Sequence, residues 1–512
     1  MFMKSILSIL ILTISSSGFS LIAKKDWVLQ CKNARGEARH TCKKIREAVG
    51  VSTSIFSFSG KWGKVYDIVS APNFSLTISD DISELSPIAG FTELGELHLA
   101  GIGQISDLSP LSYLKNLKKL HLNLEGAAAN IDLSPISALQ NMNTLGLNNS
   151  QITDTDLELL AELTNLEGLS ILVGQITDVT PLASLKNLIA LSLAHNQISN
   201  LAPIAELTNL TVLNLSSNQI SDLYPLRELT SLNALIMPDN QISDLEPLQN
   251  LNKLLILDLD NNQISKLDPI KEMVELNELK LENNQITDLD PIKNLVNLVN
   301  LILDQNRIND IEPLRNFVNL DWLCLCNNSI SNIEPIKNLK KLSRLALANN
   351  QIETIEALSE LTNLQHLELE KNRISDISAL ENLEQLFLLK IEDNLINDIS
   401  PLVNLQLLFF VFLDDNFISD FSPLLTTMRI IGGIESQTRH KDLELIERNP
   451  TPEEIESEAS CGICLAEYNS QDDVSEIEPC KHYYHKECLK QWALKHDTCP
   501  ICREQIPEKN IN

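Results

Sequence analysis

Residues 213–220 have the sequence LNLSSNQI, and the pattern L-x-L-x-x-N-x-I recurs along the chain at a fixed step of 22 residues. Leu213 and Leu215 alternate on a predicted short strand and point toward the core. Asn218 turns the chain, and its carboxamide can satisfy backbone groups that would otherwise be buried unpaired. We therefore predict a ladder of stacked asparagines. Its members in strict register are Asn196, Asn218, Asn240, Asn262, Asn284, Asn306, Asn328, Asn350, Asn372, Asn394 and Asn416.

A second motif follows most of these repeats, as in residues 220–226, which have the sequence ISDLYPL. Pro225 fixes its own backbone torsion and starts a short turn or 3₁₀ segment on the side opposite the strand. In the looser repeats nearer the N-terminus, Gly174 and Ser150 occupy the asparagine position. About 16 such units lie between residues 76 and 430, and this is the signature of a leucine-rich repeat.

The 22-residue step with its S-D-x-x-P-L motif resembles the bacterial internalin-type repeats. The pattern predicts the fold class, an α/β repeat solenoid shaped as a leucine-rich repeat horseshoe. Short parallel strands would line its concave side, and 3₁₀ turns would form its convex side.

The composition of the 512-residue chain limits the classes of partner. Hydrophobic residues make up 43% and aromatic residues 4%, so the apolar content is mainly leucine and isoleucine, which suits a repetitive aliphatic core. The formal net charge of -29 argues against nucleic acid or an anionic membrane surface as the main partner. A neutral or basic protein fits this charge, although the acids could also serve only to keep a long solenoid soluble.

Residues 1–23 have the pattern of a secretory signal peptide. Lys4 supplies a positive charge, residues 6–14 are apolar, and small residues follow them. Residues 5–22 also form an uncharged span of 18 residues, which just reaches membrane-crossing length, so an uncleaved anchor is the alternative.

Residues 24–75 break the later period and are predicted to form the N-terminal cap that covers the open core of the first repeat. If the chain is exported, Cys31 and Cys42 could close a disulfide loop. In a reducing compartment the same two residues would be small hydrophobic side chains. We favour the disulfide.

Alternate strand positions point away from the core, so the repeat also predicts which residues lie on the concave face. The acidic residues predicted there are Asp258, Asp260, Glu282, Asp304, Glu368, Glu370, Glu392, Asp414 and Asp415. The apolar ones are Ile236, Ile302, Trp322, Phe410 and Phe412. Large aromatic side chains among acids suit the binding of a protein with a basic patch. The predicted substrate-binding residues are Trp322, Asp258, Asp304, Glu368, Phe410 and Phe412.

Two features of this face have competing interpretations. Phe410 and Phe412 lie near the end of the repeats, so they could instead pack against the last repeat as part of a cap. Cys324 and Cys326 are two residues apart on one predicted strand and both would face the concave side. Because two thiols cannot complete a closed zinc site, we interpret this pair as chance placement.

The composition changes in residues 431–460, where glycines, prolines and an acidic run indicate a linker. Residues 461–506 then contain eight metal-binding residue types with the spacing C-x2-C-x15-C-x-H-x2-H-x2-C-x10-C-x2-C. These are Cys461, Cys464, Cys480, His482, His485, Cys488, Cys499 and Cys502. Six thiols and two imidazoles divide into two sets of four, and four such ligands suit tetrahedral structural Zn2+. A segment of about 45 residues builds little core, so zinc would supply much of its folding free energy.

The ligand order, with histidines in fourth and fifth place, resembles the RING finger in its H2 form. The segments PCKHYYHKEC at residues 479–488 and CPICR at residues 499–503 are similar throughout. The resemblance implies interleaved ligands for two Zn2+ ions. One site would use Cys461, Cys464, His485 and Cys488, and the other would use Cys480, His482, Cys499 and Cys502.

RING fingers of this type are ubiquitin ligases, and the resemblance implies a surface for a ubiquitin-charged conjugating enzyme at Ile463, Trp492 and Pro500. Core packing is the alternative for Trp492. Arg503 directly follows the last ligand, and the resemblance implies that a cation at this position bridges the conjugating enzyme and its bound ubiquitin. Its guanidinium has five donors in a fixed fork and can hold two carbonyl partners at once, which makes Arg503 the predicted catalytic residue.

These features together predict a RING-type E3 ubiquitin transferase that works as a non-covalent adaptor, with leucine-rich repeats that recruit a protein substrate. The signal segment and the internalin-type repeats suggest a bacterial effector that is exported and acts in a host cytosol. A membrane-anchored protein with a cytosolic RING is the alternative location. The alternative function is a secreted or surface repeat protein that binds a protein ligand, with a purely structural zinc module.

Overall fold

The computed structural model describes residues 39–44, 74–78, 82–100, 104–126, 131–149, 151–424, 430–432, 446–448, 474–477, 482–485 and 488. The chain forms two compact units, Met1–Ile330 and Ser331–Asn512. The predicted signal segment lies outside the described residues, as do Cys31 and most of the linker.

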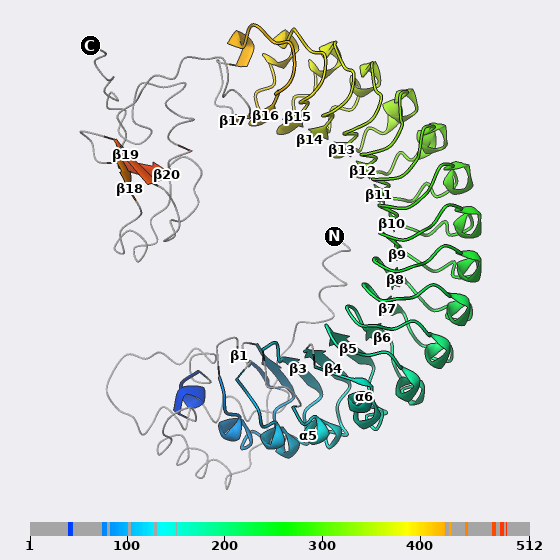
Figure 1. Cartoon of the computed structure of the whole chain (residues 1–512), viewed down its shortest axis with the longest axis vertical. Helices are drawn as coiled ribbons and strands as arrows, with labels where there is room; N and C mark the ends of the chain where they lie inside the picture. Colours follow the sequence, from blue (N-terminus) through cyan, green and yellow to red (C-terminus); the bar gives the residue numbers. More distant parts are fainter. Residues whose placement is uncertain are drawn as a thin grey trace. The chain divides into compact units, whose positions relative to one another are not determined.

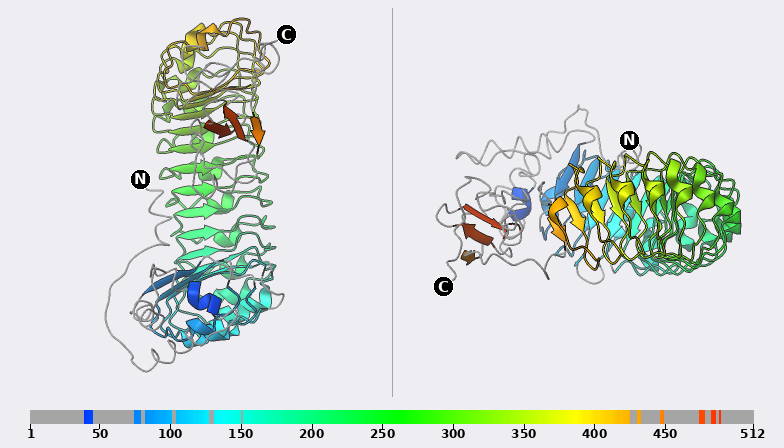
Figure 2. Two further views of the ribbon diagram at one scale, coloured as in Figure 1. Left: turned by 90° about the vertical axis from the view of Figure 1, so that its left-hand side faces the viewer. Right: turned by 90° about the horizontal axis from the view of Figure 1, so that it is seen from above.

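The first unit contains short parallel strands, β1 to β12, and within this unit each strand pairs in register with the next one (Figure 1). Their bounds are β1 (Ser75–Ile78), β2 (Glu96–Leu99), β3 (Lys119–Asn123), β4 (Thr144–Asn148), β5 (Gly168–Leu172), β6 (Ala190–Ser192), β7 (Val212–Asn214), β8 (Ala234–Ile236), β9 (Ile256–Asp258), β10 (Glu278–Lys280), β11 (Asn300–Ile302) and β12 (Trp322–Cys324). The left view of Figure 2 shows these strands stacked one above the next.

Between the strands of the first unit the chain makes one short helical segment per repeat. Two of these are α-helical, α5 (Ser134–Ser137) and α6 (Asp154–Leu160). The others are 3₁₀ turns: η2 (Ser86–Ile88), η3 (Ser109–Tyr113), η4 (Thr180–Ser184), η5 (Ala202–Ile204), η6 (Tyr224–Leu226), η7 (Glu246–Leu248), η8 (Asp268–Ile270), η9 (Asp290–Ile292) and η10 (Glu312–Asn316).

The second unit repeats the same arrangement. Its parallel strands are β13 (Arg344–Ala346), β14 (His366–Glu368), β15 (Leu388–Lys390), β16 (Phe410–Phe412) and β17 (Ile430–Gly432). Its 3₁₀ turns are η11 (Glu334–Asn338), η12 (Glu356–Leu358), η13 (Ser378–Leu380), η14 (Ser400–Leu402) and η15 (Ser422–Leu424). A separate antiparallel sheet contains β18 (Ile446–Arg448), β19 (Val474–Ile477) and β20 (His482–His485). The predicted leucine-rich repeat architecture of strands and 3₁₀ turns is confirmed in both units.

The asparagine ladder forms as predicted. The Asn218 Nδ2 atom donates hydrogen bonds to the carbonyls of Leu193, Leu215 and Ser216 at 3.0–3.1 Å, and its Oδ1 accepts the Ile198 N–H at 2.9 Å. One carboxamide therefore joins its own repeat to the preceding one. Each bond satisfies a backbone group near the core that would cost about 1–3 kcal/mol if left unpaired.

The residue before each ladder asparagine has a left-handed backbone. Ser217, for example, has φ of 52°. The same conformation occurs at Val173, His195, Asp239, Asn261, Asn283, Gln305, Asn327, Asn349, Lys371, Asp393 and Asp415. Where Gly174 replaces the asparagine, a Cβ atom would lie 2.5 Å from Oδ1 of Asn196. The looser repeat therefore needs glycine at this position to make room for the first asparagine of the strict series.

The aspartate of the S-D-L-x-P-L motif caps the 3₁₀ turn, a role that the sequence analysis missed. Oδ1 of Asp222 accepts the N–H of Tyr224 at 2.8 Å, and Pro225 follows as predicted at the start of η6. The same bond is made by Asp107, Asp132, Asp178, Asp244, Asp288, Asp310, Asp376, Asp398 and Asp420. An aspartate fits because its short side chain reaches the backbone two residues ahead.

A second asparagine ladder runs between the 3₁₀ turns and the strands. The Asn209 Nδ2 atom donates to the carbonyl of Lys186, one repeat earlier, at 3.0 Å. Equivalent bonds come from Asn116, Asn141, Asn165, Asn187, Asn297, Asn319 and Asn363. The recurring asparagine one residue before a core leucine was the signal for this ladder.

The N-terminal region contributes a short described segment, residues 39–44, which is helical. Thr41 Oγ1 donates to the carbonyl of Glu84 at 2.9 Å, next to the first 3₁₀ turn. Cys42 is fully buried and disulfide-bonded. Cys31, its predicted partner, lies outside the described residues, so the pairing and the cap at residues 24–75 stay predictions.

Replacement of Asn262 by alanine tests the ladder. Asn262 is 8% exposed, and its carboxamide makes four backbone hydrogen bonds of 2.9–3.1 Å. We expect the variant to lose about 2–4 kcal/mol of unfolding free energy in urea, because several buried backbone groups lose their partner. The adjacent, exposed Gln263→Ala is the matched control and should unfold like the native chain. Equal stability of the two variants would contradict the ladder's role.

Candidate functional site

The acidic part of the concave face in the first unit is internally paired. Asp258 is only 9% exposed, and its Oδ2 lies 3.4 Å from Nζ of Lys280 on the next strand. Lys280 also lies 3.0 Å from Oε1 of Glu278. Burial raises the pKa of Asp258, and the Lys280 charge opposes that rise. Asp258 therefore offers less negative charge to a partner than the sequence suggested.

Asp260 follows on the same face, and its Oδ1 accepts the N–H of Glu282 at 2.6 Å. Burial and the neighbouring Asp258 carboxylate raise the pKa of Asp260 to about 7. At neutral pH the carboxyl is consequently close to half protonated. Glu282 accepts a hydrogen bond from Gln305 Nε2 at 2.7 Å, so each of these acids is tied to the neighbouring repeat.

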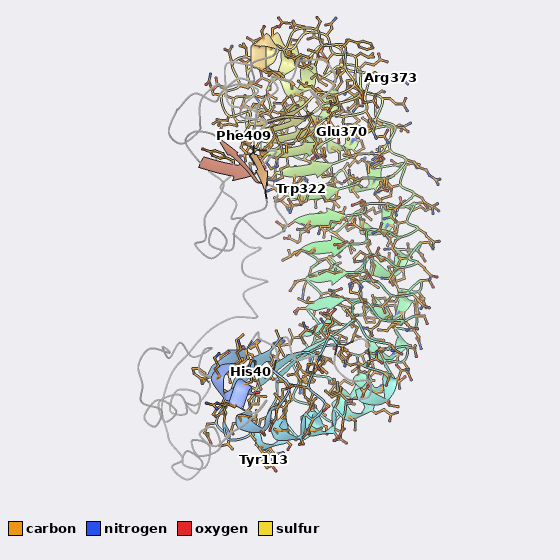
Figure 3. All side chains as sticks on the ribbon, turned by 60° about the vertical axis from the view of Figure 1, so that its left-hand side comes forward. His40, Tyr113, Trp322, Glu370, Arg373 and Phe409 are labelled. Atoms are coloured by element: carbon orange, nitrogen blue, oxygen red, sulfur yellow. The ribbon has the colours of Figure 1, made fainter. Side chains whose placement is uncertain are left out.

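Trp322, labelled in Figure 3, begins strand β12. It pairs with Asn300 of β11. Its side chain is half-buried, whereas the sequence predicted an exposed one. Ile302 and Cys324 are each 6% exposed, whereas Cys326 and Ile236 are half-buried. Trp322 is therefore the largest side chain on this part of the strand surface.

Asp304 lies on the same side of the strands as Trp322, one repeat earlier in the sequence. Its side chain is half-buried, and Oδ1 accepts the N–H of Cys326 at 2.5 Å. A carboxylate held this way has a fixed orientation while part of it still faces solvent. The predicted pair of Trp322 and Asp304 thus occupies one local surface.

In the second unit, Glu368 forms an ion pair with Lys390 at 2.9 Å. Glu370 and Glu392 each have a buried Oε2 with no hydrogen-bond partner among the described residues. Burial raises the pKa of both carboxyls. Asp414 is half-buried and Asp415 is exposed. Glu368 therefore resembles Asp258 in having a lysine partner within its own face.

Phe410 is half-buried within an aromatic cluster at the start of β15 and β16. Its ring centroid lies 5.4 Å from that of Phe387 and 4.9 Å from that of Phe409, both in edge-to-face geometry. Phe412 is also half-buried. Strand β17 pairs with β16 beyond these residues, so the sheet continues past them. The cluster gives Phe410 a packing role inside the repeats, alongside the predicted partner contact.

Only part of the predicted zinc module is described. His482 and His485 begin and end β20, which pairs with β19. Tyr484 is fully buried and Cys488 is half-buried. The predicted ligands and enzyme-contact residues that lie outside the described residues are Cys461, Cys464, Cys480, Cys499, Cys502, Ile463, Trp492, Pro500 and Arg503.

Within the described part of the chain, no three His, Cys, Asp or Glu residues are placed to hold a metal ion. The donor set in the sequence, with its six thiols and two imidazoles, fits structural zinc on chemical grounds. The same described residues contain no helix that is long and apolar enough to cross a membrane.

Comparison with family models assigns both parts of the chain. Residues 459–503 match the ring finger domain, residues 186–228 match the two-copy leucine-rich repeat model, and residues 318–374 match a further leucine-rich repeat model. The chain therefore contains leucine-rich repeats and a segment that matches the ring finger domain. This segment is similar to the RING fingers of E3 ubiquitin-protein ligases.

The E3 ubiquitin-protein ligase RNF181 of Danio rerio is 38% identical over 62 residues, which is 12% of this chain and 39% of the relative. The RING-H2 finger protein ATL18 of Arabidopsis thaliana is 38% identical over 65 residues, 12% of this chain and 45% of the relative. The chain thus spans less than half the length of these curated relatives, and each similarity covers 12% of this chain.

Among solved structures, an internalin (inlF) from Listeria monocytogenes is similar to the repeats, with 28% identity and a TM-score of 0.52. The match covers 72% of this chain and 94% of the internalin. A leucine-rich repeat protein of Leptospira interrogans shares the fold at 24% identity and a TM-score of 0.57, covering 67% of this chain and 95% of that protein. The predicted likeness to internalin-type repeats agrees with the first of these.

Replacement of Asp260 by Asn tests the electrostatics of the concave face. Because the folded-state pKa is raised from 3.8 to about 7, the stability that the protonated carboxyl provides is complete below pH 3.8 and is lost as the pH rises through 7. Asparagine keeps an acceptor for the Glu282 N–H but cannot ionise. We therefore expect the unfolding free energy of Asp260→Asn, relative to that of the native chain, to rise by about 1–2 kcal/mol as the pH increases from 5 to 8, after allowance for solvent screening.

Urea unfolding of the native and variant chains at both pH values measures this difference. Asp268→Asn, at an exposed position in η8, is the matched control and should show no such gain. A constant difference between native and Asp260→Asn chains across the pH range would contradict the raised pKa.

Proposed function

We propose that the protein is a RING-type E3 ubiquitin transferase whose leucine-rich repeats recruit a protein substrate. The observation that carries this proposal is the ring finger match at residues 459–503, within which all eight predicted zinc ligands stand at the expected spacing. Relatives named as E3 ubiquitin-protein ligases share this segment. The finger would bind a ubiquitin-charged conjugating enzyme and form no covalent intermediate.

Two Zn2+ ions, when bound, would supply the folding free energy of the small module. In the proposed mechanism, Ile463, Trp492 and Pro500 contact the conjugating enzyme. The Arg503 guanidinium donates hydrogen bonds to the enzyme and to its bound ubiquitin, which restricts the ubiquitin to an orientation open to attack by a substrate lysine. Catalysis of this kind comes from proximity and orientation alone.

Substrate recruitment is assigned to the concave face of the repeats. Asp258 and Glu368 already pair with lysines, so they would contribute less to binding a basic partner. Trp322 and Asp304 are the proposed anchors, because a half-buried aromatic ring and a fixed carboxylate lose little conformational entropy on binding. A Trp322→Ala, Asp304→Asn double variant that still captured its partner would contradict this placement.

The proposed location is a host cytosol, reached by export through the segment at residues 1–23. Two observations support it: the signal-like composition of that segment and the internalin-like repeats. A membrane-anchored chain with a cytosolic finger is the alternative. Sequencing the mature N-terminus separates the two, because a chain beginning near residue 24 excludes the anchor.

Arg503→Ala in the full chain tests the transferase mechanism. The variant should keep two zinc ions per chain, because Arg503 follows the last ligand and is not itself one. It should lose roughly tenfold or more in the rate of ubiquitin discharge from the charged conjugating enzyme, since the bridging donors are gone. The control is Arg373→Ala, an exposed arginine of the repeats. Discharge at the native rate by Arg503→Ala would remove Arg503 from the mechanism.

A further inference from the structure

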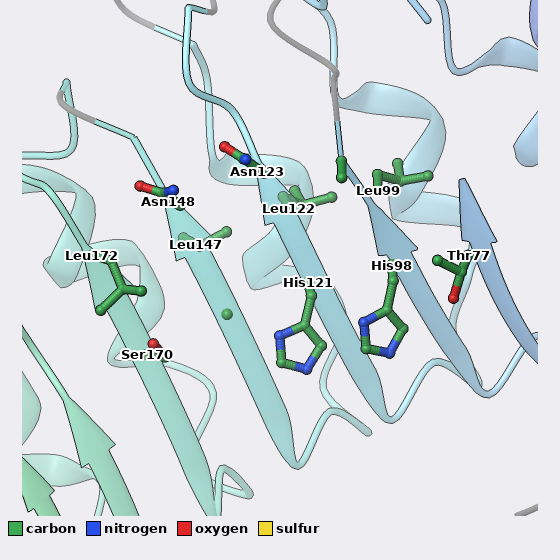
Figure 4. A pocket seen from close by; sticks show the side chains of 12 residues that line it. Thr77, His98, Leu99, His121, Leu122, Asn123, Leu147, Asn148, Ser170 and Leu172 are labelled. Atoms are coloured by element: carbon green, nitrogen blue, oxygen red, sulfur yellow. The ribbon is translucent and has the colours of Figure 1, made fainter. Parts of the chain in front are cut away.

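A hollow of about 370 Å³ lies on the strand side of β2–β5 in the first unit (Figure 4). His98, His121, Gly146, Ser170 and Leu172 line it, with apolar side chains making up most of the remaining wall. A volume of this size suits a single small organic group. The predicted concave-face residues all lie on later repeats, and the sequence pattern gave no signal for this hollow.

The hollow exists because of two small residues at the central strand position. His121 on β3 is paired in register with Gly146 on β4, which is paired with Ser170 on β5. Gly146 has no side chain, so the His121 ring can lie over it, and the short side chain of Ser170 leaves space beside that ring. A Cβ atom at residue 146 would lie 2.3 Å from Nδ1 of His121, so glycine is also needed for the imidazole to lie where it does.

The two imidazoles form an aromatic wall beside this space. The ring centroids of His98 and His121 are 4.5 Å apart and their planes differ by 14°. Burial, and to a smaller extent the nearby His98, lower the pKa of His121 to about 4, so its ring is neutral at physiological pH. Nε2 of His121 has no hydrogen-bond partner among the described residues, which leaves packing to hold the ring. The flat, neutral imidazole of His121 favours stacking with another aromatic ring.

Polar groups surround the apolar interior. Asn123 and Asn148 lie opposite each other on β3 and β4. Oδ1 of Asn123 accepts the N–H of Glu125 at 3.1 Å, which leaves its Nδ2 as a donor. Within the described part of the chain, the Asn148 side chain makes no hydrogen bond. Apart from the two imidazoles, the described lining residues carry no ionisable side chain, which disfavours an ionic ligand.

We propose that this hollow binds an aromatic side chain of a protein segment that crosses β2–β5, with the carboxamides of Asn123 and Asn148 hydrogen-bonded to the main chain of that segment. An aromatic ring fills the space over Ser170 and stacks on the imidazole pair, whereas peptide groups on either side of it match the free amide donors and acceptors. The identification of the segment as part of a substrate rests on the proposed function, but the binding site itself does not.

Binding of a minimal probe to the full chain tests the proposal. The chain has nine histidines, so ring resonances of a chain labelled with carbon-13 histidine are few enough to follow individually. N-acetyltryptophanamide, which has one aromatic side chain and two amide groups, should shift the His98 and His121 resonances saturably. N-acetylleucinamide at the same concentrations should not. The absence of a saturable shift with N-acetyltryptophanamide would overturn the proposal.

Ser170→Leu fills the hollow and should weaken probe binding at least tenfold. Ser192→Leu is the matched control, because Ser192 is paired in register with Ser170 on β6 and lies outside the lining. Urea unfolding of both variants checks that each is folded. Equal affinity of the two variants would contradict the site. If free indole bound as tightly as N-acetyltryptophanamide, the ligand would be a small aromatic molecule and the peptide contacts would be wrong.

The same variants separate this inference from the proposed function. Ubiquitin discharge depends on the RING finger, so Ser170→Leu should leave its rate unchanged. A chain that binds the probe but accelerates no discharge would reject the transferase proposal and retain the site. A chain that accelerates discharge but binds no probe would reject the aromatic binding site and retain the transferase proposal.

Discussion

The carboxamide of one asparagine per repeat is the contact on which the rest of the solenoid depends. A chain that turns sharply beside an apolar core leaves carbonyl and amide groups without water, and each would be costly if unpaired. Asn218 satisfies four of them and spans two repeats in doing so. The repeat length is fixed as a consequence, because inserting one residue would break bonds in two repeats at once.

The fixed register between repeats determines which side chains lie next to one another on the strand surface. Since equivalent residues of successive repeats lie side by side, a local change in composition becomes a local change in surface chemistry. Imidazoles and small residues meet at β2–β5, where His121 lies beside Gly146. Acids and a lysine meet where Asp258 lies beside Lys280. The formal net charge of -29 therefore does not indicate the charge of any one part of this surface.

Much of the fold follows from the sequence, because the repeat specifies strand, turn and core positions together. Leu213, Asn218 and Pro225 are found in the predicted roles. The capping by Asp222 was also visible as a motif, but its bond was overlooked. The raised pKa of Asp260 depends on the depth of burial, and the hollow beside Gly146 depends on how the His121 ring lies. Neither follows from residue spacing. The zinc ligands are predictions from residue spacing.

The central claim is that the RING finger of this chain activates a ubiquitin-charged conjugating enzyme. Single-turnover discharge of ubiquitin to free lysine, with the full native chain and a panel of conjugating enzymes, tests it most directly. We expect at least one enzyme to discharge faster with the native chain than alone, and we expect no acceleration from Cys480→Ser, which lacks one predicted zinc ligand. Discharge that the native chain fails to accelerate with every enzyme of the panel would contradict the account.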